Sequence, residues 1–224
     1  MRIVNHDKDR TGRCGIPEVI YGEGKTGDDL VDIVQRFLAE SGRAIVTKID
    51  EVKASKVMKS VDPKKCAVNY NVRGKVLVIK NKDFKQESVG SVGILTAGTS
   101  DIPVAEEAKG VAEELGCTVY SEYDVGIAGM HRVFAAIEKM PDVRVLIVIA
   151  GMEGALPSVV SGLVSAPVVG VPTSVGYGTA EHGRTALYTM LNSCTPLAVM
   201  NIDNGYGAAV LAYKILLSGK DKSV

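Results

Sequence analysis

Apolar residues in the second half of the chain form short, near-continuous runs that alternate with segments of helical period. Residues 145–149 read Val-Leu-Ile-Val-Ile, and residues 168–171 are three valines around one glycine. Strands that are apolar at every position are typical of a parallel sheet covered by helices on both faces. We expect strands at residues 92–95, 118–120, 145–149, 168–171 and 197–200, and helices near 102–116, 130–139, 154–164, 183–192 and 206–217. The pattern predicts a doubly wound three-layer α/β/α sandwich with a flavodoxin-like or Rossmann-like core.

The first part of the chain has a different pattern. Residues 1–25 are rich in glycine and basic residues without a clear period, which predicts a loop or arm. Apolar residues at helical spacing predict a helix over residues 28–41, with Thr26 as its cap and Gly42 at its end. Short strands are expected at residues 44–47, 66–70 and 76–79, with a polar helix near 51–60. A polar stretch then places the domain boundary near residue 88, giving an N-terminal arm with a small α+β domain (1–87) and a catalytic domain (88–224).

Composition narrows the partners and the compartment. The 26 basic residues balance 26 acidic ones, so net charge gives no reason to expect nucleic acid or an anionic membrane. The N-terminus has no apolar signal core, and no stretch is long and apolar enough to span a bilayer. The four cysteines form no C-x-x-C pair, which favours free thiols in a reducing cytoplasm. Cys66 and Cys117, in apolar strand patterns, are expected to be inert.

The loop after the first strand of the second half is the first candidate for chemistry. Ligands of doubly wound sheets bind beyond the carboxyl ends of the strands. Gly98-Thr99-Ser100-Asp101 stands at that position and Pro103 follows, so Ser100 can cap a helix whose free N–H groups favour phosphate or carboxylate. The alternative is that Ser100 and Asp101 merely cap the helix.

The next strand ends carry further candidates. His131 and Arg132 follow the second strand, and Glu153, between Met152 and Gly154, follows the third. We expect Glu153 to be buried and suited to proton transfer, with His131 as the reserve candidate. The alternative for Glu153 is that it only balances a helix dipole.

Three more segments complete the set of candidates. The long loop after the fourth strand contains Gly176-Tyr177-Gly178 and could close over a ligand. Asn204 follows the fifth strand, and Cys194 lies in the turn before it. Most free cysteines are inert, so residue type alone assigns Cys194 no chemical role.

Several of these motifs, in this order, resemble a known family. Residues 98–101, 128–132, 151–157 and 170–172 resemble the conserved segments of aminoimidazole ribonucleotide carboxylases and mutases. Those enzymes carry a His just before Leu-Pro, whereas this chain reads Glu153-Gly154-Ala155-Leu156-Pro157. A closer resemblance, covering nearly the whole chain, is to the LarB family of nickel-pincer cofactor biosynthesis, through residues 13–26, 151–154, 176–178 and 192–194.

The LarB resemblance implies pyridinium-3,5-biscarboxylic acid mononucleotide synthase activity. In that reaction nicotinic acid adenine dinucleotide takes up CO2 at pyridine C5, and its phosphoanhydride is hydrolysed to release AMP. The essential cysteine of the family corresponds to Cys194. The resemblance also implies a homo-octamer with active sites at subunit contacts.

Roles for the other candidates follow from this chemistry. Glu153 or His131 would take the C5 proton, and the loop at Gly176 would close over the pyridine. Arg13 and Lys25 would balance the pyrophosphate charge, and Mg2+, with Asp101 as a ligand, is predicted for phosphoanhydride hydrolysis. Two alternatives stay open: an aminoimidazole ribonucleotide carboxylase or mutase, and a non-catalytic dinucleotide-binding regulator.

Overall fold

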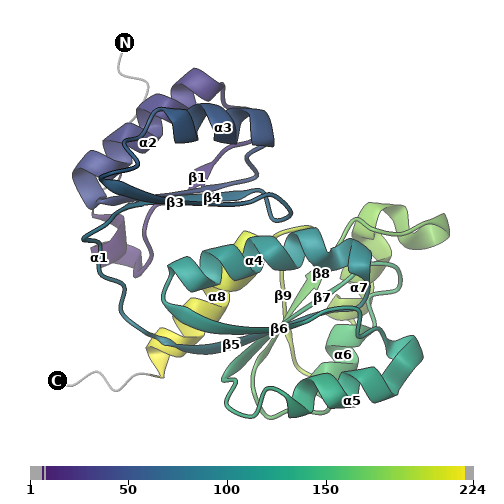
Figure 1. The fold of residues 1–224 in the computed structure, drawn as a ribbon. Coiled ribbons are helices and arrows are strands. Elements are labelled where there is room, and N and C mark those ends of the chain that lie inside the picture. The colour runs from purple at the N-terminus through teal and green to yellow at the C-terminus, as the bar shows by residue number, and fades with distance from the viewer. Residues whose placement is uncertain (1–6, 8, 220–224) are drawn as a thin grey trace. The chain divides into compact units, whose positions relative to one another are not determined.

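The computed structural model describes residue 7 and residues 9–219. The chain divides into two compact units, residues 1–87 and 88–224, and each is described by itself below. No helix among these residues is long and apolar enough to cross a membrane. The elements of both units are drawn in Figure 1.

The N-terminal unit is a small mixed sheet with helices on one face. Its sheet has the order β1-β2-β4-β3, in which β1 pairs parallel with β2 and the other pairs are antiparallel. Side chains of α2 and α3 pack against one face of this sheet and form a core. The elements are α1 (Arg10–Cys14), β1 (Ile20–Tyr21), α2 (Gly27–Ser41), β2 (Arg43–Thr47), α3 (Glu51–Lys59), β3 (Cys66–Asn71) and β4 (Val76–Asn81).

The local signals in this unit account for most of these elements. Thr26 accepts a hydrogen bond from the Asp29 N–H, and Gly42 ends α2 in the left-handed region, as the sequence predicted. The expectation of an unstructured arm over residues 1–25 is wrong in part. Ile20 is buried, and pairing with β2 draws this segment into the sheet as β1, after the short helix α1.

The C-terminal unit confirms the predicted three-layer sandwich. Its five strands are all parallel, in the order β6-β5-β7-β8-β9, which is the flavodoxin-like arrangement. The strands are β5 (Gly90–Thr96), β6 (Cys117–Glu122), β7 (Val145–Ala150), β8 (Val168–Pro172) and β9 (Ala198–Val199). The helices are η1 (Thr99–Asp101), α4 (Ile102–Glu114), η2 (Ile127–Gly129), α5 (Met130–Glu138), α6 (Leu156–Ser161), η3 (Gly178–Gly183), α7 (Arg184–Leu191) and α8 (Gly205–Ser218).

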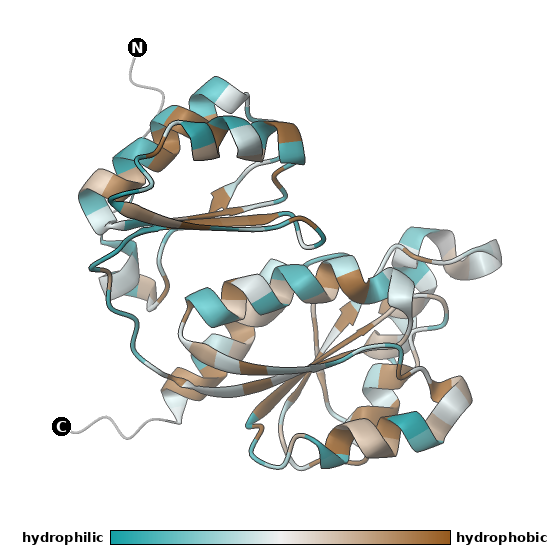
Figure 2. Ribbon diagram, viewed as in Figure 1, coloured by the Kyte–Doolittle hydropathy of each residue, from teal (hydrophilic) through white to brown (hydrophobic). Residues whose placement is uncertain are grey.

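Two cores lie on the two faces of the parallel sheet. One face packs against α4 and α8, and the other packs against α5, α6 and α7. Every residue of β7 is buried, which is why that strand reads as an unbroken apolar run. In Figure 2 the strands of this sheet are largely brown, whereas the helices mix brown and teal positions. The unbroken apolar run of β7 therefore follows from helices packing on both faces of the sheet.

Two local expectations need correction. Asp101, and not Ser100, accepts the Gly98 N–H at the start of η1, at 2.9 Å. The helix predicted near residues 154–164, α6, begins at Leu156, since Gly154 has a φ of 68° and keeps the chain out of the helical region. The later start of α6 lengthens the open loop after β7.

Candidate functional site

A cavity of about 550 Å³ opens at the carboxyl ends of the parallel strands. It lies beside the ends of β5 and β7, the point where the strand order reverses, which is the usual ligand site of this fold. Its volume is within the range of small-molecule sites. The described residues that line it are Ala97, Gly98, Ser100, Asp101, Gly126, Ile127, Ala128, Ala150, Gly151, Met152, Glu153, Ala155, Leu156, Val175, Gly176 and Tyr177.

Asp101 joins the loops around this cavity. Its side chain is only 3% exposed, and its Oδ1 accepts a hydrogen bond of 2.6 Å from the hydroxyl of the fully buried Thr173. Its Oδ2 accepts the Gly98 N–H, and the Gly151 backbone also contributes a hydrogen bond. Burial raises the pKa of Asp101, although these hydrogen bonds oppose the rise. The carboxylate therefore ties together the segments that follow β5, β7 and β8.

This arrangement does not fit the predicted magnesium ligand. Both carboxylate oxygens of Asp101 already accept hydrogen bonds from the protein. Among residues 7 and 9–219, no group of three or more His, Cys, Asp or Glu side chains could hold a metal ion. Magnesium remains a prediction from the chemistry of phosphoanhydride hydrolysis.

The loop after β7 makes a close backbone contact with the loop after β8. The Met152 N–H donates to the Val175 carbonyl oxygen at 2.9 Å. A Cβ at Gly151 would lie 2.6 Å from the Thr173 hydroxyl and still closer to the Val175 carbonyl. Met152 itself has a φ of 48°, a conformation that costs a non-glycine residue about 1 kcal/mol or more. The two loops can approach each other this closely because Gly151 has no side chain, and together they form one wall of the cavity.

Glu153 lies at this wall, but it is exposed rather than buried. The expectation of a buried carboxylate was wrong because the chain turns outward at Met152 and Glu153 before Gly154 packs against Ala186 of α7. Glu153 still lines the cavity, so its carboxylate is accessible to a bound molecule.

The second strand-end loop contributes backbone and apolar atoms in place of the predicted cations. His131 is exposed in the first turn of α5, and it is outside the described lining of the cavity. Arg132 donates to the carboxylate of Asp124, with Nη1 and Oδ2 2.8 Å apart. Gly126, Ile127 and Ala128 line the cavity, although they were not among the predicted site residues. Their position in the loop after β6, at the carboxyl end of a parallel strand, could have indicated that they line a ligand site.

Other predicted residues divide between the cavity and its surroundings. Ser100, Gly176 and Tyr177 line it, as do Gly98, Asp101, Met152 and Glu153 described above. Asn204 instead caps α8 by accepting the Gly207 N–H at 2.7 Å. Thr99, Gly154 and Gly178 are not in the described lining. Leu156 and Val175, which were not among the predicted site residues, contribute apolar surface.

Cys194 is exposed and stands apart from the cavity lining of its own chain. Its loop follows α7, and the adjacent Thr195 donates from its hydroxyl to the Ser158 carbonyl at 3.0 Å. Gly183, at the other end of α7, packs against the Thr173 carbonyl near the cavity. An eight-residue helix of about 12 Å lies between these two points. Cys117, in contrast, is buried, and burial raises the pKa of its thiol to about 11, in keeping with the inert role predicted for it.

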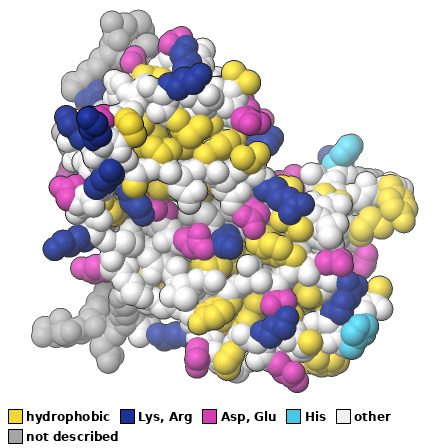
Figure 3. All heavy atoms as spheres, in the orientation of Figure 1, with side chains coloured by type: hydrophobic (Ala, Val, Ile, Leu, Met, Phe, Trp, Pro, Cys, Tyr) yellow, Lys and Arg dark blue, Asp and Glu magenta, His cyan; other side chains and the backbone are white. Residues whose placement is uncertain are grey.

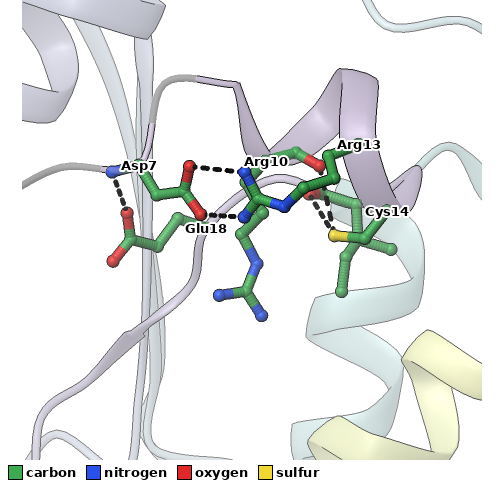
Figure 4. A network of polar contacts seen from close by, with 6 residues as sticks. Asp7, Arg10, Arg13, Cys14 and Glu18 are labelled. Carbon is green, nitrogen blue, oxygen red and sulfur yellow. Dashed lines mark hydrogen bonds and ion pairs between the residues drawn. The ribbon is translucent and has the colours of Figure 1, made fainter.

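The two predicted cations of the arm belong to the N-terminal unit. Arg13 donates to both carboxylate oxygens of Asp7, whose backbone N–H donates to Glu18 (Figure 4). The pKa of Arg13 is raised by this pairing with Asp7. Lys25 is half-buried in the turn before α2. Their roles toward a pyrophosphate remain predictions.

Charge is unevenly distributed between the cavity and the surface. Figure 3 shows Lys and Arg interspersed with Asp and Glu over the face drawn, without a large patch of either sign. The described lining of the cavity, however, contains two carboxylates and no Lys, Arg or His. The cavity is therefore apolar and acidic.

The fold and the cavity place this chain in the class of α/β proteins. It has a flavodoxin-like α/β/α unit with a cavity where the strand order reverses, and a small mixed-sheet unit. Comparison with known families is more specific. A family model described as AIR carboxylase matches residues 91–224, and one described as LarB/PurE-like N-terminal domain matches residues 1–82. The chain belongs to the AIR carboxylase family, whose members are catalytic.

The chain is also similar to several individual proteins. The chain is 49% identical to the uncharacterized protein MJ0165 of Methanocaldococcus jannaschii, over 92% of this chain and 81% of that protein. It is 34% identical to an N5-carboxyaminoimidazole ribonucleotide mutase of Pyrococcus horikoshii, over 56% of this chain and 71% of the mutase. A crystal structure of a Treponema denticola PurE2 variant is similar with a TM-score of 0.48 and 24% identity, covering 58% of this chain and 81% of that one.

Proposed function

We propose that the protein carboxylates the pyridine ring of nicotinic acid adenine dinucleotide at C5 and hydrolyses its phosphoanhydride, releasing AMP and pyridinium-3,5-biscarboxylic acid mononucleotide. The observation that supports this substrate best is the acidic and apolar lining of the cavity, which lacks Lys, Arg and His among its described residues. A ring with a positive charge is complementary to such a lining, whereas a neutral aminoimidazole gains less from it. The match of residues 1–82 to a LarB/PurE-like N-terminal domain also supports it.

The proposed carboxylation begins with a covalent step. The thiolate of Cys194 adds to C4 of the pyridinium ring and converts it to an uncharged dihydropyridine. The enamine carbon C5 then attacks CO2, which forms the new C–C bond and leaves an iminium at the ring nitrogen. The thiolate addition is needed because an electron-poor pyridinium ring does not attack CO2, whereas the dihydropyridine has a nucleophilic C5.

Proton removal completes the carboxylation. Glu153, exposed at the cavity wall, takes the C5 proton and restores the dihydropyridine. The electron pair of the ring nitrogen then expels the thiolate and restores aromaticity. Hydrolysis of the phosphoanhydride consumes one water and separates AMP from the dicarboxylated mononucleotide.

A neighbouring copy of the chain supplies the thiol in this proposal. Cys194 is exposed, but it lies outside the described cavity lining of its own chain. An octamer with sites at subunit contacts, as expected from the resemblance to the LarB family, would bring the thiol of one chain to the cavity of another. The exposure of Cys194 in the single chain is consistent with such a contact.

The reaction is tested directly with purified protein. Incubation with nicotinic acid adenine dinucleotide and bicarbonate, with and without Mg2+, should give AMP and the dicarboxylated mononucleotide by mass spectrometry. Cys194→Ala should abolish carboxylation while leaving the circular dichroism spectrum unchanged. Full turnover by this variant would exclude the covalent step.

Mixed assemblies test whether the site is shared. Chains carrying Cys194→Ala and chains carrying Glu153→Gln, each inactive alone, are co-expressed with different tags and purified as mixed oligomers. Recovered activity is expected, because some cavities then combine an intact Glu153 with an intact thiol from the other chain. No recovery in verified mixed oligomers would mean that both groups must come from one chain.

The second candidate is an N5-carboxyaminoimidazole ribonucleotide mutase. The similarity to the mutase of Pyrococcus horikoshii favours it, but that similarity covers only 56% of this chain. Turnover of N5-carboxyaminoimidazole ribonucleotide, measured in parallel, separates the two reactions. Tight binding of the dinucleotide without turnover of either substrate would support a dinucleotide-binding regulator.

A further inference from the structure

Tyr177 is an unusually exposed aromatic residue at the mouth of the cavity. Its side chain is 81% exposed, yet it belongs to the cavity lining. A phenol ring exposed at the edge of a cavity has apolar surface and an aromatic face available for contact with a ligand. Tyr177 therefore has surface to offer a bound molecule.

The backbone on both sides of Tyr177 consists of glycine in conformations that other residues avoid. Gly176 has a φ of 152° and Gly178 a φ of 65°. A Cβ at Gly176 would lie 2.6 Å from the Ala180 Cβ, whereas one at Gly178 would meet nothing within 4 Å. Gly176 is thus packed closely against its neighbours, while a side chain at Gly178 would have open space around it.

The charge of the cavity indicates what the ring would contact. Asp101 and Glu153 are the carboxylate side chains of the described lining, and Asp101 already accepts hydrogen bonds from Thr173 and Gly98. The remaining described lining is apolar or backbone, apart from Ser100 and Tyr177. The electron-rich face of a phenol ring attracts a cation, and this attraction grows when water is excluded. A flat ring that carries a positive charge matches both the lining and Tyr177.

We propose that Tyr177 is the specificity-determining residue that selects a positively charged heteroaromatic ring, by stacking its phenol face on that ring over the cavity. The proposal deepens the proposed function, on which it rests for the identity of the ring as an N-ribosylated pyridinium. It concerns binding alone, so it is tested without bicarbonate and without turnover.

The test compares two ligands of nearly equal shape that differ in ring charge. Nicotinic acid mononucleotide carries a pyridinium ring, and its dihydro form carries the same substituents on an uncharged ring. The dissociation constant of each is measured by isothermal titration calorimetry for wild type, Tyr177→Phe and Tyr177→Leu. Wild type and Tyr177→Phe should prefer the charged ring, and Tyr177→Leu should bind it about five- to thirtyfold more weakly, or roughly 1–2 kcal/mol.

Tyr188 provides the matched control. It is also an exposed tyrosine, at 58%, but it lies on α7 outside the described cavity lining. Tyr188→Leu should leave both dissociation constants unchanged. The proposal is overturned if Tyr177→Leu weakens both ligands equally, if it weakens neither, or if Tyr188→Leu has the same effect.

Assembly is checked in the same samples by light scattering. Tyr177→Leu is expected to keep the oligomer size of wild type; a smaller oligomer would assign Tyr177 to a subunit contact and overturn its role in ring selection. Failure of the proposed carboxylation is a separate result. A protein that binds the charged ring through Tyr177 but never carboxylates it would retain this inference and lose the proposed reaction.

Discussion

The loop after β5 and the loop after β7 each bring one carboxylate to the same cavity, with opposite surroundings. Asp101 is 3% exposed and holds Thr173 and Gly98, whereas Glu153 is exposed. A buried carboxylate with two fixed donors is suited to shaping a site, and an accessible one is suited to meeting a substrate. Position at a strand end therefore does not by itself assign a chemical role to a carboxylate.

The largest expected effect tests the accessible member of this pair. Glu153→Gln should lower the carboxylation rate by roughly 100- to 10,000-fold, because an amide cannot take the C5 proton. The free energy of unfolding should stay within about 0.5 kcal/mol of wild type, since the side chain is exposed. Steady-state kinetics and urea unfolding measure the two quantities, and a near-normal rate would assign proton transfer to another group.

The buried member should behave in the reverse manner. Asp101→Ala leaves the Thr173 hydroxyl and the Gly98 N–H without their acceptor, which should lower the free energy of unfolding by about 2–4 kcal/mol. Urea unfolding measures this loss, with Glu153→Ala as the exposed control. A loss equal to that of the control would mean that Asp101 does not hold the loops together.

Glycines in the same two loops offer a smaller and matched contrast. Gly151→Ala forces a Cβ against the Thr173 hydroxyl and the Val175 carbonyl, so it should cost roughly 1–3 kcal/mol and distort the cavity wall. At Gly98 the nearest atom to an added Cβ is the Asp101 Oδ2, at 3.7 Å, so Gly98→Ala should change stability by less than about 1 kcal/mol. Thermal unfolding and ligand titration of both variants check the difference; equal effects would contradict the close packing at Gly151.

The smallest effect is a dependence on pH. Because burial raises the pKa of Asp101 in the folded state, the folded chain keeps this proton to a higher pH than the unfolded chain, whose value stays near 3.8. The stability from this group is fully present below that pH and is lost as the pH rises through the folded value. Relative to Asp101→Asn, which does not titrate, wild type should lose stability across this window. Urea unfolding at several pH values measures the change, and a constant difference would argue against the raised pKa.

The pattern of apolar residues was enough to predict the strands, the helices and the layers of the C-terminal unit. Unbroken apolar runs such as residues 145–149 require cover on both faces, and the helical periods between them supply it, so local pattern and global fold agree. The same reasoning predicted a ligand site at the strand ends, and the predicted residues Gly98, Asp101, Glu153 and Tyr177 line the cavity there.

The contacts of these residues could not be predicted from the sequence, because they form between segments that are distant in the chain. The hydrogen bond between Asp101 and Thr173 joins residues 72 positions apart, and the sequence contains no local signal for it. The exposure of Glu153 depends on the turn at Met152 and on Gly154 packing against α7, and the separation of Cys194 from its own cavity depends on the direction of that helix. Periodicity reports which face of an element is buried, whereas burial and partners at a loop depend on segments that meet only after the chain has folded.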